Sequence, residues 1–147
     1  MAKDFTTVFQ VNQSPNEVFR TVTNVRRWWQ GLFAEEIDGE TDKLNKEFTF
    51  VAAAGAHYSK QKLIELVPGQ KVVWLVTEGR LSYIENTDEW EGTKIIFDIS
   101  KRGDKTEVRF THEGLNPRFE CYDSCSTSWQ QYLREKLIPL LNTEKTI

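Results

Sequence analysis

The stretch GTKIIFDISKRGDKTEVRFTHEGLNPRFECYDSCSTSWQQYLREKLIPLL, Gly92–Leu141, decides the fold, because two strand-like runs lead directly into a long amphipathic helix. The runs are Thr93–Lys101 and Thr106–His112, and the polar segment Arg102–Lys105 between them indicates a hairpin turn. Alternation at every second position places one set of side chains on a common face of this pair. That face contains Ile95, Phe97, Ile99, Val108, Phe110 and His112.

The helix that follows has an apolar stripe at three- and four-residue steps, which predicts that it lies across the sheet. The stripe consists of Tyr122, Cys125, Trp129, Tyr132 or Leu133, Leu137 and Leu140. Aromatic rings therefore meet aromatic rings where helix and sheet face each other. Such faces either pack solidly or leave a pocket, and the sequence leaves both alternatives open.

Composition indicates a folded globular protein without an electrostatic reason to bind nucleic acid. The 147 residues are 39% apolar, 28% charged and 12% aromatic, and they suit one domain over residues 1–147. The formal net charge is −3 and the isoelectric point is about 5.5. We therefore expect no polyanionic partner.

The chain also lacks the signals of membrane insertion and secretion. No run approaches the roughly 18 apolar residues of a membrane span, and the first residues do not resemble a secretory signal. We expect a cytoplasmic protein. Cys121 and Cys125 are too few for a disulfide framework, so reduced, buried thiols are expected.

The rest of the chain reads as one strand, two short helices and a further series of strands. Asp4–Val11 alternates like a strand, and Ser14, Pro15 and Glu17 form a helix-start signal. A second short helix is expected at Val25–Gln30. The further strands are expected at Leu32–Ile37, Glu47–Ala53, His57–Val67 and Lys71–Thr77, with a long loop or irregular edge at Glu78–Glu91.

This order predicts an α+β fold of the helix-grip type. A curved, mostly antiparallel sheet wraps around a long C-terminal helix, and two short helices follow the first strand. The run Val72–Val76 is apolar on both faces of its strand, so this strand should be covered on both sides or lie in the middle of the sheet.

The chain resembles the START/Bet v 1-like superfamily, and within it the domains similar to the C-terminal half of the Hsp90 ATPase activator. Trp129 follows Ser128, whereas the family usually has Gly-Trp at this point of the last helix. The segments that carry the resemblance are Ser14–Phe19, Trp28–Trp29, Leu63–Gly69, Glu89–Thr93 and Thr106–Leu115.

The resemblance implies a hydrophobic cavity that binds a small apolar or amphipathic molecule, without a cofactor. Because the last helix roofs the cavity in this fold, we expect His112 at the polar end of the cavity. We also expect Tyr122, near the start of the helix, to contact the ligand. The expected walls are Trp29, Phe50, Trp74, Phe97, Phe110, Trp129 and Tyr132. Each of these aromatic residues could instead belong to a solid core. His112 could simply hold the turn into Glu113–Gly114.

Two other functions stay open at this point. One is a cyclase- or hydrolase-like enzyme that uses His112 with Tyr122 or Tyr132, although no catalytic motif is visible. The other is a cochaperone-like interaction domain. The two cysteines with His57 and His112 offer zinc-ligand chemistry, but their spacing is not that of a zinc motif, so no metal is expected. A monomer and a homodimer are equally compatible with the sequence.

Overall fold

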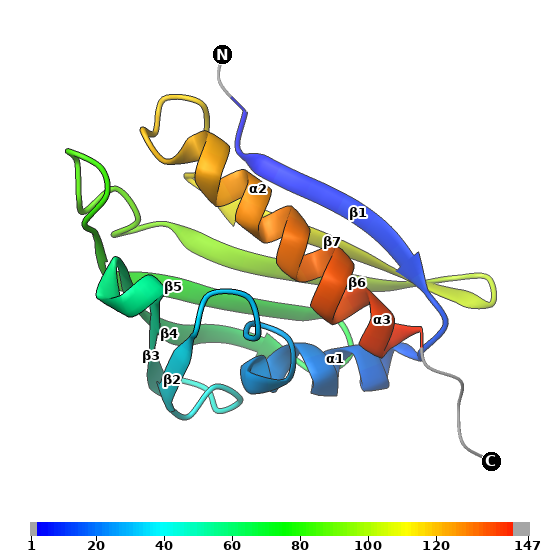
Figure 1. Ribbon diagram of the computed structural model, residues 1–147. Coiled ribbons are helices and arrows are strands. Elements are labelled where there is room, and N and C mark those ends of the chain that lie inside the picture. The colour runs from blue at the N-terminus through cyan, green and yellow to red at the C-terminus, as the bar shows by residue number, and fades with distance from the viewer. Residues whose placement is uncertain (1–2, 143–147) are drawn as a thin grey trace.

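The computed structural model describes residues 3–142, which form one antiparallel sheet of seven strands gripping a long C-terminal helix (Figure 1). The strands lie side by side in the order β1-β7-β6-β5-β4-β3-β2. Their bounds are Phe5–Val11 (β1), Glu36–Gly39 (β2), Glu47–Ala52 (β3), His57–Val67 (β4), Lys71–Leu81 (β5), Lys94–Arg102 (β6) and Lys105–Glu113 (β7). The predicted helix-grip fold is confirmed.

The hairpin β6–β7 has the register that the alternation predicts. Phe97 pairs with Phe110 and Ile95 pairs with His112, and all four side chains are buried. β5 lies at the centre of the sheet, as the apolar run Val72–Val76 indicated. The N-terminal strand β1 pairs with β7, so the first and seventh strands of the chain are neighbours.

The first helix, α1 (Pro15–Thr23), begins at the predicted cap. The Ser14 hydroxyl accepts a hydrogen bond from the Glu17 amide at 3.3 Å, and Pro15 occupies the first turn. A single 3₁₀ turn, Val25–Arg27, stands where a second short helix was expected. It carries the chain directly to the buried pair Trp28–Trp29.

The C-terminal helix is interrupted near its end. α2 (Tyr122–Tyr132) continues through a π-helical turn, Leu133–Leu137, into the short α3 (Ile138–Leu141). Pro139 has no amide hydrogen, and its ring would clash with the carbonyl four residues earlier in a regular helix. A widened turn just before Pro139 relieves this clash.

The prediction of a strand at Leu32–Ile37 was wrong for residues 32–35, because β2 begins at Glu36. Residues Gly31, Leu32 and Phe33 donate their amides to the side chain of Glu35 and not to a neighbouring strand, at 2.7, 3.1 and 3.0 Å. β5 runs four residues further than expected, to Leu81, which shortens the long loop to residues 82–93. We call these two segments the 31–35 loop and the 82–93 loop.

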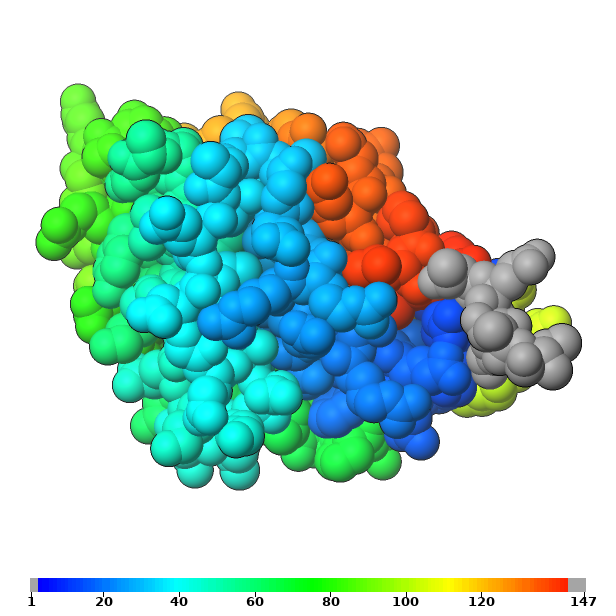
Figure 2. All heavy atoms as spheres, turned by 60° about the horizontal axis from the view of Figure 1, so that its bottom comes forward, coloured from blue at the N-terminus to red at the C-terminus, as the bar shows by residue number. Residues whose placement is uncertain are grey.

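The core lies between the concave face of the sheet and the last helix. The largest side chains that are almost completely buried include Trp28, Trp74 and Trp129. Figure 2 shows the segment from α1 to β2, in blue and cyan, covering one face beside the orange and red end of the helix. No helix among residues 3–142 is both long and apolar enough to cross a membrane.

Candidate functional site: an aromatic pocket between α2 and β3

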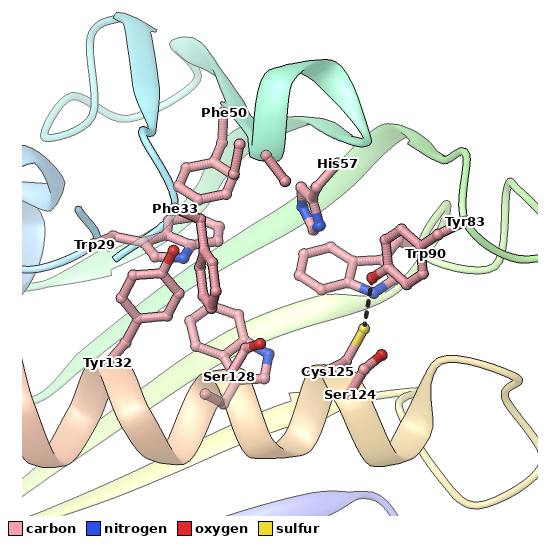
Figure 3. A pocket seen from close by; sticks show the side chains of 13 residues that line it. Trp29, Phe33, Phe50, His57, Tyr83, Trp90, Ser124, Cys125, Ser128 and Tyr132 are labelled. Atoms are coloured by element: carbon pink, nitrogen blue, oxygen red, sulfur yellow. Dashed lines mark hydrogen bonds between the residues drawn. The ribbon is translucent and has the colours of Figure 1, made fainter. Parts of the chain in front are cut away.

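A pocket of about 190 Å³ lies between the outer end of the sheet and the first part of α2 (Figure 3). Its walls come from Trp29 after the first 3₁₀ turn, the 31–35 loop, the end of β3 with the adjoining Ala53, the start of β4, the 82–93 loop and α2. The lining residues are Trp29, Phe33, Phe50, Ala52, Ala53, His57, Tyr83, Trp90, Ser124, Cys125, Ser128, Trp129 and Tyr132.

Stacked rings form the inner wall of the pocket. Trp29 stacks on Phe50, with ring centroids 3.9 Å apart, and on Trp129 at 4.9 Å. Trp90 lies parallel to Trp129 at 6.1 Å. Offset stacking of this kind fixes the rings against one another, so the wall is rigid.

Exposed aromatic side chains stand at the rim. Phe33 is 39% exposed and Tyr83 is 50% exposed, and both also line the pocket. Large apolar side chains left in contact with water beside a pocket are a common feature of binding sites. The rim therefore extends the apolar character of the inner wall to the surface.

No lysine, arginine, aspartate or glutamate lines the pocket. His57 is the one lining residue whose side chain ordinarily titrates near neutrality, and burial lowers its pKa to about 4. The ring of His57 meets Phe50 and Trp90 edge-on, and its Nε2 lies 3.3 Å from the Ser59 hydroxyl. A neutral imidazole among rings offers one polar contact without introducing charge.

The 31–35 loop is fastened to α2 through Glu35. Besides the three loop amides, the Glu35 carboxylate accepts a short hydrogen bond from the Tyr132 hydroxyl. Partial burial raises the pKa of Glu35, but the bonds from Tyr132 and the backbone outweigh burial and leave the pKa below its ordinary value. The ionised carboxylate thus holds Phe33 at the mouth of the pocket.

The 82–93 loop is fastened to the start of α2 by two carboxylates. Glu89 accepts hydrogen bonds from the amides of Glu120 and Cys121 at 2.9 and 3.3 Å. Glu120 accepts in return from the amides of Asn86 and Glu85 at 2.8 and 3.2 Å. We call this reciprocal arrangement the carboxylate clasp. It satisfies amides at the helix start and fixes the loop that carries Tyr83 and Trp90.

His112 lies behind the pocket wall and not among the lining residues. Trp129 Nε1 donates to His112 Nδ1 at 3.0 Å, and His112 Nε2 lies 2.8 Å from the Thr93 hydroxyl. That hydroxyl donates to the carbonyl of Trp90 at 2.6 Å, so the imidazole Nε2 carries the proton and donates to Thr93. Burial, with a smaller effect from His57, lowers the pKa of His112 to about 3.

The structure therefore brings together only part of the predicted ligand-binding set. Trp29, Phe50, Trp129 and Tyr132 line the pocket. Phe110 packs directly against Trp129, with ring centroids 4.7 Å apart, so no space separates the helix from the sheet there. Trp74, Phe97 and His112 are buried behind that contact, and Tyr122 is partly buried outside the lining.

Sequence reasoning did not assign Phe33, His57, Tyr83, Trp90 or Cys125 to the site. Three of these residues lie in loops without periodicity, so no pattern indicated where their side chains point. They are Phe33, Tyr83 and Trp90. A signal was nevertheless present for two of them, since Tyr83 and Trp90 lie in the predicted long loop Glu78–Glu91, and long loops within compact domains are often functional. Cys125 was part of the apolar stripe that predicted which face of the last helix lies toward the sheet.

Two further properties limit the chemistry of the site. Within residues 3–142, no three histidine, cysteine or acidic side chains gather closely enough to hold a metal ion. Both ring nitrogens of His112 are already hydrogen-bonded, so no contact in the described part of the chain supports its use as a base on a molecule in the pocket.

Comparisons with known proteins agree with this fold. The family model described as Activator of Hsp90 ATPase homolog 1-like protein matches residues 12–142. The solution structure of the Aha1 dimer from Colwellia psychrerythraea superimposes with a TM-score of 0.73 at 21% identity, covering 98% of this chain and 99% of the other.

Two further solved structures have the same fold. A protein from Chromobacterium violaceum has a TM-score of 0.70 at 16% identity, with 95% of this chain and 98% of that chain covered. A major latex-like protein from Panax ginseng has a TM-score of 0.62 at 12% identity, with 90% and 93% covered. A comparison with curated proteins finds no significant match.

Proposed function

The chain belongs to the Activator of Hsp90 ATPase homolog 1-like protein family, and from this premise we propose that it binds one small, uncharged, planar apolar molecule in its aromatic pocket. The observation that carries the proposal is the unfilled volume of about 190 Å³ bounded by the rings of Trp29, Phe50, Trp90 and Trp129. Aromatic walls with few polar groups are typical of sites that bind through burial of apolar surface.

The volume limits the size of the ligand. A dry protein cavity of about 150 Å³ is large enough for benzene. A pocket of about 190 Å³ that opens between Phe33 and Tyr83 therefore suits one substituted ring or a small fused pair of rings. The rigid wall of stacked rings supports a planar ligand over a branched one.

The absence of charge in the lining limits the chemistry of the ligand. A charged group in this pocket would lose its hydration without gaining an ion pair, because no lysine, arginine, aspartate or glutamate lines it. His57, neutral because its pKa is lowered to about 4, supplies one hydrogen-bonding nitrogen. An uncharged ring with a single hydroxyl, carbonyl or N–H group fits this arrangement.

The proposal is tested by thermal melting and tryptophan fluorescence with indole, 1-naphthol and acetophenone, each added up to its solubility. Binding should raise the melting temperature saturably and alter the emission of the lining indoles. Tryptamine, which carries a positive charge on an indole ring, should have no effect at equal concentration.

A matched pair of variants locates the binding site. Ser128→Leu places a larger side chain in the pocket and should abolish the response, whereas Thr127→Leu adds the same group on the exposed side of α2 and should retain it. If no uncharged ring stabilises the protein, or if Ser128→Leu still responds like the wild type, the pocket is not a binding site. Such a result would favour the cochaperone-like alternative.

A further inference from the structure

We infer that the pocket contains a nucleophilic thiol, and that Cys125 forms a covalent adduct with an apolar α,β-unsaturated carbonyl compound. The inference deepens the proposed function and rests on it, because the compound reaches the thiol through the same pocket. Three features carry it: the position of the thiol, the donors around it, and a buried N–H group without a partner.

The first feature is the position of Cys125. It lies in the first part of α2, is 4% exposed, and lines the pocket beside Tyr83 and Ser124 (Figure 3). Cys121, one turn earlier, is 1% exposed and does not line the pocket. A molecule inside the pocket therefore meets one of the two thiols and not the other.

The second feature is the set of donors around the sulfur. The Tyr83 hydroxyl and the Cys125 sulfur are hydrogen-bonded at 3.7 Å (Figure 3). The Cys121 thiol is the largest influence that lowers the pKa of Cys125; burial opposes it, and Tyr83 and Ser124 add to it. The pKa of Cys121 is raised, chiefly by the neighbouring Cys125 thiol, so Cys121 stays the protonated member of the pair. Lowered pKa is the usual basis of thiol reactivity.

The third feature is the indole N–H of Trp90. The Trp90 side chain is 3% exposed, and its Nε1 has no hydrogen-bond partner among the described residues. In Figure 3 this nitrogen faces the side of the pocket where Cys125 and Tyr83 meet. A buried donor without an acceptor is unfavourable, and a ligand oxygen at this point would remove the deficit.

These groups match the electron flow of a conjugate addition. The Cys125 thiolate forms a bond to the β-carbon, and the π-electrons move through the α-carbon to the carbonyl oxygen, giving an enolate. The Trp90 N–H is the donor for that oxygen. The α-carbon then takes up the proton that the thiol released, through the Tyr83 hydroxyl or water. No oxidant, reductant or leaving group is involved, so atoms and electrons balance.

The test uses N-phenylmaleimide as the electrophile and N-phenylsuccinimide, which lacks the reactive double bond, as its matched control. Intact-mass measurement at pH 7 should show the addition of one reagent molecule to the folded protein, with peptide mapping on Cys125. The rate should exceed that of N-acetylcysteine by at least about tenfold, and N-phenylsuccinimide should slow it by competition. In denaturant both cysteines should react.

Substitutions of the two cysteines and of Tyr83 test the role of each side chain in the labelling reaction. Cys125→Ser should abolish labelling of the folded protein, whereas Cys121→Ser should still be labelled on Cys125, more slowly. Tyr83→Phe, at an exposed position, should slow labelling about tenfold through loss of a hydrogen bond to a charged group. Thermal melting of each variant verifies that it is folded.

The outcomes separate the two proposals. If N-phenylsuccinimide stabilises the protein but N-phenylmaleimide does not label Cys125 faster than N-acetylcysteine, the thiol inference is overturned and ligand binding stands. Equal labelling of Cys121 and Cys125 in the folded protein also overturns it. If N-phenylsuccinimide neither binds nor competes, both proposals fail.

Discussion

At the scale of single residues, His112 shows how a histidine on an inward face can serve the structure of a pocket without lining it. Its two nitrogens link the Trp129 indole to the Thr93 hydroxyl, and Thr93 in turn contacts the Trp90 carbonyl. The chain of hydrogen bonds thus connects two tryptophans that form the pocket wall. The sequence predicted the inward direction of His112, but not that both nitrogens would be occupied by side chains from other elements.

The lowered pKa of His112 predicts a pH dependence of stability. The folded protein keeps the imidazole neutral down to about pH 3, whereas the unfolded chain protonates it near the ordinary value of 6.5. The unfolded state therefore binds more protons between these values, and stability falls as the pH drops through this range. From pH 7 to pH 5, His112 alone should account for a loss of about 2 kcal/mol in the free energy of unfolding.

His112→Gln provides the check, because an amide can accept from Trp129 and donate to Thr93 but does not titrate. Urea unfolding at pH 7 and pH 5 should show a decrease smaller by about 2 kcal/mol in this variant than in the wild type. Equal decreases would show that His112 titrates normally in the folded protein.

At the scale of elements, the two loops at the pocket are positioned by carboxylates that accept backbone amides. Glu35 organises the 31–35 loop, and Glu89 and Glu120 form the carboxylate clasp between the 82–93 loop and α2. A carboxylate at a helix start is also favoured by the helix dipole. These interactions position the mouth of the pocket, where Phe33 and Tyr83 are 39% and 50% exposed.

Replacing Glu89 should release the 82–93 loop without unfolding the sheet. Glu89→Ala leaves the amides of Glu120 and Cys121 without their acceptor, at an expected cost of about 1–2 kcal/mol. Hydrogen exchange should accelerate at Glu120, Cys121 and the 82–93 loop, and remain unchanged in β6 and β7. Asp88→Ala, at the exposed neighbouring position, is the control, and similar exchange in the two variants would refute the clasp.

The elements also show which parts of the structure the sequence could predict. Alternation in β6 and β7 and the Ser14 cap of α1 are local signals, and the structure confirms both. A strand was predicted from Leu32 to Ile37, whereas the interaction that decides the shape of the 31–35 loop comes from one carboxylate that satisfies three amides. The π-helical turn before Pro139 is likewise a compromise between local sterics and the packing of a long helix.

At the scale of the whole molecule, the position of the pocket follows from where the helix meets the sheet. Near Phe110 and Phe97 the rings of Trp129 and Trp28 fill the space completely, whereas toward β3 the small side chains of Ala52, Ala53 and Ser128 leave room. Four of the nine residues expected at the site line that space. The others could not be separated by sequence, because residues of one strand face share a direction but differ in depth beneath the helix.

The central claim is that an uncharged ring occupies this pocket, and the most direct test is a two-dimensional NMR spectrum of the indole N–H groups during titration with indole. The five tryptophans provide an internal comparison, since Trp29, Trp90 and Trp129 line the pocket and Trp74 lies behind it. We predict saturable shifts of the Trp29, Trp90 and Trp129 signals, largest for the unpartnered N–H of Trp90, with little change at Trp74. Unchanged signals, or shifts at Trp74 as large as those at Trp90, would contradict the account.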